Sequence, residues 1–101
     1  MKIPKKLKVG AHTYNVEISK TRDEKKGDGN WGKTMYARCQ IYLDEHLVPS
    51  KQEETFLHEI LHVAMDQSGL NVDFDREKEE GIVNRLTAAL YPILKENNLL
   101  K

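Results

Sequence analysis

The chain has 101 residues, enough for a single domain (residues 1–101) with one modest hydrophobic core and too few for a second catalytic domain. Lysine plus arginine and aspartate plus glutamate number 16 each, so no net charge points to nucleic acid or to an anionic membrane as a partner. No apolar stretch approaches the roughly 18 residues of a membrane span, and no apolar signal core follows the basic start of the chain. We therefore expect a cytoplasmic protein.

Short segments of alternating apolar and polar residues predict a sheet in the first half of the chain. Residues 7–9 and 14–18 alternate around a glycine-containing turn, which is typical of a β-hairpin. Residues 19–33 are charged and then rich in glycine, which predicts a long exposed loop that Trp31 anchors rather than a lid over a site. Residues 35–44 predict one long strand or two shorter ones, so the sheet should have three or four antiparallel strands.

Two helices should follow the strands. The first should open near Ser50, which with Glu53 fits a capping box, and should end at Gly69. The second should begin near Arg76 after a short turn, with acidic residues in its first turn and an apolar stripe behind them. Pro92 predicts a kink or an end in this helix. The expected fold is α+β, with a small antiparallel sheet of three to four strands packed on two antiparallel helices.

The first predicted helix carries His58, Glu59 and His62 in the pattern H-E-x-x-H. The spacing places both imidazoles on one helix face, one turn apart, where they can bind the same ion. In this pattern two neutral imidazoles hold zinc and the glutamate takes a proton from a zinc-bound water. Apolar residues surround the motif, and a glutamate buried between two histidines is costly unless a metal compensates it. The alternative is a pair of core histidines without a metal.

A catalytic zinc site needs a third protein ligand and an open fourth position for water. Because the turn between the two predicted helices is short, the second helix should run back beside the first and bring its early residues to the motif. Glu77, Glu79 and Glu80 are the candidates for the third ligand. Each of them could instead be a solvated carboxylate near a helix N-terminus.

The H-E-x-x-H motif followed by Glu80 and Asn84 resembles the gluzincin metallopeptidases, especially ImmA/IrrE-like domains and their short, often phage-encoded relatives. In those families Asn or Asp follows the ligand glutamate by four residues, which favours Glu80 over Glu79. The resemblance implies a minimal zincin-like fold and a Zn²⁺ ion held by His58, His62 and Glu80. It also gives the motif glutamate the general-base role and makes Asn84 the residue that orients an imidazole.

The resemblance implies zinc-dependent hydrolysis of a peptide bond in a protein or peptide substrate, with Glu59 accepting and then delivering the proton. The substrate would add a strand to an edge of the sheet, and we expect residues 41–43 to form that edge. Tyr91 could stabilise the oxyanion, although a core position suits it better.

One rival interpretation is a catalytically silent, zinc-stabilised protein-interaction module, because the chain has no second lobe to wall a cleft. The two interpretations differ at Glu59, which hydrolysis requires and which zinc binding does not.

Overall fold

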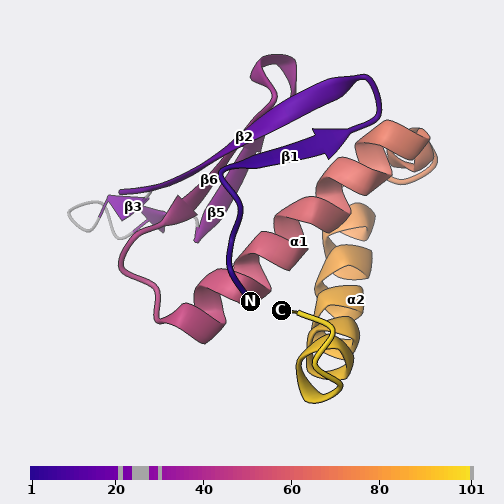
Figure 1. Cartoon of the computed structure of the whole chain (residues 1–101). Coiled ribbons are helices and arrows are strands. Elements are labelled where there is room, and N and C mark those ends of the chain that lie inside the picture. The colour runs from indigo at the N-terminus through magenta and orange to yellow at the C-terminus, as the bar shows by residue number, and fades with distance from the viewer. Residues whose placement is uncertain (21, 24–27, 30, 101) are drawn as a thin grey trace.

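The chain folds into a four-stranded sheet followed by two helices, so the predicted α+β class is confirmed (Figure 1). The computed structural model describes residues 1–20, 22–23, 28–29 and 31–100. The main strands are β1 (Lys6–Val9), β2 (His12–Ser19), β5 (Gly32–Met35) and β6 (Gln40–Asp44). The other elements are the short pair β3 (Arg22–Asp23) and β4 (Asp28–Gly29), the 3-10 turns η1 (Tyr36–Arg38) and η2 (Leu70–Val72), and the helices α1 (Pro49–Ser68) and α2 (Arg76–Glu96).

The sheet is mixed rather than wholly antiparallel. Its strand order is β1-β2-β6-β5, and the β1–β2 and β5–β6 pairs are antiparallel. The β2–β6 pair is parallel, with Val16 opposite Ile41, so the prediction of an antiparallel sheet is wrong at this pair. β6 lies between β5 and β2, and it runs in the same direction as β2. Alternation in the sequence predicts a strand but does not predict its neighbour.

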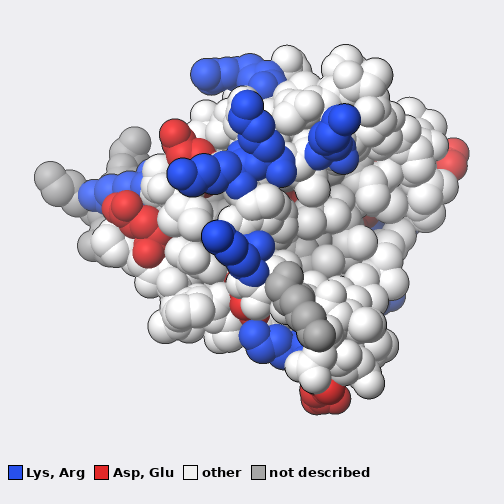
Figure 2. Space-filling model, in the orientation of Figure 1, with Lys and Arg blue, Asp and Glu red and all other residues white. Residues whose placement is uncertain are grey.

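The edges of this sheet are β1 and β5. The prediction that residues 41–43 form an edge is therefore wrong, because β6 has a partner strand on each side. Lys and Arg side chains gather over β1 and the segment before it, which include the exposed Lys6 and Lys8 (Figure 2). Exposed lysines on an edge strand oppose pairing with another chain. The other edge, β5, lies against α1.

The hydrophobic core lies between the sheet and α1. Its buried members are Tyr14, Ile41, Leu43, Phe56 and Val63. Burying one such side chain contributes about 1.5–3 kcal/mol, so these contacts fix the rotation of α1 against the sheet. Phe56 and Val63 are two turns apart on one side of the helix. This rotation leaves the two histidines of the motif on the side of α1 that faces α2.

The start of α1 differs from the predicted capping box. Val48 is the N-cap residue, its side chain makes no capping hydrogen bond, and Pro49 occupies the first helical position. The fixed backbone angle of proline suits that position without a cap. Glu53 does not cap the helix and instead accepts hydrogen bonds from α2. Gly69, with φ 81°, ends α1 as predicted.

The two helices run antiparallel, as predicted. Glu53 near the start of α1 contacts Lys95 near the end of α2, whereas His62 farther along α1 contacts Glu79 at the start of α2. α2 continues past Pro92 to residue 96, so the proline does not end it. Among the described residues, neither helix has the length and apolar character needed to cross a bilayer.

Candidate metal centre

Three side chains from the two helices converge beside the sheet. His58 and His62 lie one turn apart on α1, with ring centroids 4.8 Å apart. Glu80 reaches both from α2: its Oε1 lies 3.0 Å from His58 Nε2 and its Oε2 lies 2.9 Å from His62 Nε2. One ligand atom from each of the three residues lies within 4.8 Å of the others. These residues form a group that can hold a metal ion.

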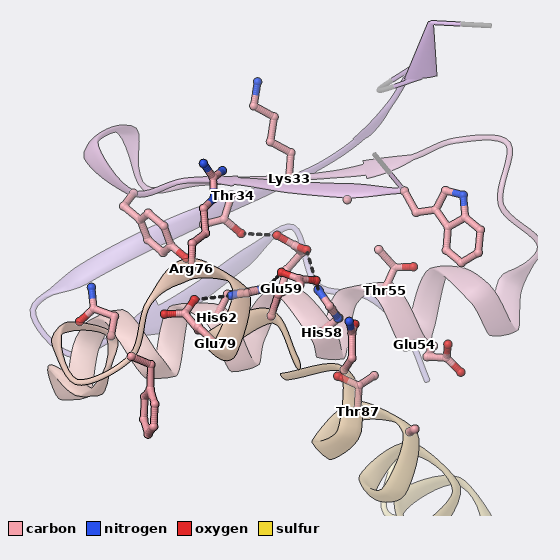
Figure 3. Close-up of a pocket in the computed structure, with 18 residues that line it drawn as sticks. Lys33, Thr34, Glu54, Thr55, His58, Glu59, His62, Arg76, Glu79 and Thr87 are labelled. Atoms are coloured by element: carbon pink, nitrogen blue, oxygen red, sulfur yellow. Dashed lines mark hydrogen bonds and ion pairs between the residues drawn. The ribbon is translucent and has the colours of Figure 1, made fainter. Parts of the chain in front are cut away.

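The other side of the His62 ring contacts Glu79, where Nδ1 lies 2.7 Å from Glu79 Oε2 (Figure 3). An Nδ1–H that donates to this carboxylate leaves the Nε2 lone pair directed at Glu80. A lone pair and a carboxylate oxygen 2.9 Å apart repel each other unless a cation, either a proton or a metal ion, lies between them. A metal ion supplies that cation, and a histidine that binds metal commonly donates its second ring N–H to a carboxylate. The donor set therefore fits a metal.

This geometry separates the three glutamates that the sequence left as candidates. Successive residues of a helix project about 100° apart, so Glu79 and Glu80 reach different atoms of the same imidazole. Glu77 is exposed and does not line the pocket. Asn84 lines the pocket, but the residue that hydrogen-bonds to the His62 imidazole is Glu79, so the role expected for Asn84 stays a prediction. The sequence made Glu79 a candidate, but the alignment of its carboxylate with His62 depends on how the two helices pack.

Glu59 lies beside the group and is buried, with 7% of its surface exposed. Its Oε1 accepts a hydrogen bond of 2.7 Å from Thr34 Oγ1 on β5, and its Oε2 lies 4.0 Å from His58 Nε2. The carboxylate is thus held at the edge of the convergent group (Figure 3). Sequence reasoning did not find Thr34. Strand alternation puts Gly32 and Thr34 on one face of β5, but no local pattern indicates that this face meets Glu59.

Tyr36, which follows β5, lines the same pocket and was also missed. Burial, and then the negative charges of Glu79, Asp66 and Glu59, raise the pKa of the Tyr36 hydroxyl to about 12. The hydroxyl therefore keeps its proton at neutral pH and is a hydrogen-bond donor. Trp31 also lines the pocket and is 45% exposed, and its role as an anchor of the loop stays a prediction.

Tyr91, the oxyanion donor considered from the sequence, lies elsewhere. Its hydroxyl donates to Glu53 Oε1 at 2.7 Å, between the two helices. Burial, followed by that hydrogen bond, raises the pKa of Tyr91 to about 12. Tyr91 is half-buried and lies outside the hydrophobic core cluster, so it is not the core tyrosine that the sequence favoured.

The geometry thus matches what the H-E-x-x-H pattern requires of its histidines, and Glu80 completes a group of two imidazoles and one carboxylate. The second histidine is the fourth residue after the first along one helix, and the carboxylate comes from the next helix. Comparisons of the chain with models of protein families, with curated proteins and with solved structures find no match.

Proposed function

We propose that this protein is a zinc-dependent metallopeptidase that hydrolyses peptide bonds of a protein or peptide substrate. The observation that carries the proposal is the convergence of His58, His62 and Glu80, with the buried carboxylate of Glu59 beside them. Two imidazoles and one carboxylate are a ligand set of catalytic zinc sites. The same set accepts manganese, iron or cobalt, so zinc is the ion that the ligands favour rather than the sole one they fit.

A zinc ion held by these residues would supply Lewis-acid activation of water and polarisation of the scissile carbonyl. Glu59 accepts a proton from the attacking water and delivers it to the leaving nitrogen as the C–N bond breaks. Its Oε2 is the oxygen nearer to His58 and so the one placed for this transfer. Glu79 holds the His62 ring through Nδ1 and keeps Nε2 directed toward Glu80.

The strand that would receive the substrate is β5. It is an edge of the sheet, and Gly32 and Thr34 from this strand line the pocket. An extended peptide that pairs with β5 adds a strand to the sheet and passes above Glu59. Tyr36 follows directly and keeps its proton, so it is suited to donate a hydrogen bond to a developing oxyanion.

Metal content is the first test. The purified chain, grown with zinc and without chelators, should contain about one zinc ion per molecule, and Glu80→Ala should contain much less. Glu77→Gln is the matched control, because this exposed glutamate of the same helix turn does not line the pocket. A wild-type protein without metal would contradict the proposal.

Catalysis is tested by Glu59→Gln with fluorescently labelled casein as substrate. The variant should retain zinc and lose about 100-fold or more of the hydrolysis rate, since it lacks the base.

A zinc-stabilised interaction module remains the second candidate, because the convergent group joins α1 to α2 and an ion there would fasten the helix pair. Zinc binding without hydrolysis by the wild-type protein would favour this module.

A further inference from the structure

The hydrogen bond between Thr34 and Glu59 joins the edge strand to the helix of the motif. Thr34 Oγ1 donates to Glu59 Oε1 at 2.7 Å, across 25 residues of sequence. The second carboxylate oxygen is directed toward the convergent group, 4.0 Å from His58 Nε2. The two oxygens of Glu59 therefore have different surroundings. Oε1 accepts a hydrogen bond from Thr34 on β5, and Oε2 faces the place where a reacting water would lie.

Gly32 makes this contact sterically feasible. A Cβ at residue 32 would lie 2.7 Å from Thr55 Cγ2 and 3.1 Å from Glu59 Cγ. A side chain at this position would therefore force Thr55, Glu59 or β5 itself to shift. Because Gly32 and Thr34 share a face of the strand, the missing side chain of the first lets the hydroxyl of the second reach the carboxylate. The stem of Glu59 is thus confined by the backbone of β5, and its head group is confined by Thr34.

We propose that Thr34 is a positioning residue for Glu59. This inference rests on the proposed function, since it concerns the base of that reaction. The terminal torsion of a glutamate is broad and poorly restrained by itself. The Thr34 hydroxyl fixes this torsion so that Oε2 stays directed at the reacting water. The bond persists after Oε2 accepts a proton, because Oε1 remains a hydrogen-bond acceptor.

The test compares Thr34→Val, which keeps the shape but lacks the hydroxyl, with Thr34→Ser, which keeps the hydroxyl. Thr13→Val, on the exposed face of β2, is the matched control. Each protein is loaded with Co²⁺, and the visible spectrum gives the affinity for the metal and for acetohydroxamate, which gives up a proton as it binds. Hydrolysis of labelled casein gives kcat and KM.

Thr34→Val should bind Co²⁺ and casein as the wild type does, whereas its kcat should fall about 10–100-fold through misplacement of the base. Its affinity for acetohydroxamate should fall as well. Thr34→Ser should restore both values, and Thr13→Val should change neither. A Thr34→Val protein with normal kcat and normal acetohydroxamate affinity would overturn the inference, as would a loss that Thr34→Ser does not restore.

The outcomes also separate this inference from the proposed function. If the wild type binds Co²⁺ but does not cleave casein, the peptidase proposal is contradicted, and the acetohydroxamate affinities still decide whether Thr34 positions Glu59. If the wild type binds no metal, both proposals are overturned. If Thr34→Val lowers the affinity for Co²⁺ but leaves kcat and the affinity for acetohydroxamate unchanged, Thr34 has a structural role. The positioning proposal is then overturned.

Discussion

Adjacent residues Glu79 and Glu80 contact the same imidazole from two sides, so we expect them to have separate effects on metal affinity. Glu79→Gln should weaken zinc binding about 10–100-fold, because the amide is a poorer acceptor for the His62 Nδ1–H. Glu80→Ala should weaken it further, since it removes a ligand. Competition with a chelator of known affinity measures both constants. Equal affinities for Glu79→Gln and wild type would show that the contact does not support the metal group.

Glu53 is the residue whose charge should set the acid stability of the helix pair. Hydrogen bonds from the Met1 ammonium, from Lys95 and from Tyr91 lower its pKa from 4.5 to about 2. A pKa lowered by folding stabilises the protein above pH 4.5, and this contribution is lost as the pH falls toward 2. Glu53→Gln should cost about 2–3 kcal/mol at pH 7.

Urea unfolding of the wild type and of Glu53→Gln at several pH values measures the difference between their free energies of unfolding. This difference in free energy should become steadily smaller below pH 4.5. A difference that stays constant down to pH 2 would contradict the assignment.

At the scale of whole elements, replacing glycine by alanine should have opposite effects on stability at two positions. Gly81→Ala in α2 adds a methyl group with no atom within 4 Å and should stabilise the metal-free protein by about 0.5–1 kcal/mol. Gly32→Ala in β5 forces a contact with the buried Thr55 side chain and should destabilise it by about 1–3 kcal/mol. Urea denaturation measures both, and equal signs would refute the close packing of β5 on α1.

The sequence predicts elements well where the information is local. The spacing of His58 and His62, the stop at Gly69 and the start of α2 near Arg76 all depend on neighbouring residues, and the structure agrees with each. The resemblance also selected Glu80, which the structure places against both histidines.

Prediction fails where the information is non-local. The parallel β2–β6 pair and the edge position of β5 depend on which strands meet, and alternation does not encode this. Thr34 and Tyr36 were missed for the same reason, because their approach to the motif follows from the docking of β5 on α1. Part of the loop predicted at residues 19–33 lies outside the described residues, and its described part contains β3, β4 and the start of β5.

For the whole molecule, a metal that binds only the folded chain should raise its stability. The convergent group takes its atoms from two helices, so unfolding separates them. At a free zinc concentration about 100 times Kd, the free energy of unfolding should rise by about 2.7 kcal/mol. Calorimetry with zinc and with a chelator tests this, and Glu80→Ala should show little difference between the two. A wild-type melting temperature that does not change with zinc would contradict the proposed metal site.

The parallel pairing of β2 with β6 should delay completion of the sheet during folding. It joins Asn15 to Gln40 across the whole β3–β5 segment, whereas the β5–β6 pair joins Met35 to Gln40, which are close in the chain. Contacts between close neighbours lose less entropy on closure and form earlier. The β5–β6 pair should therefore form before the β1–β2 hairpin docks against β6.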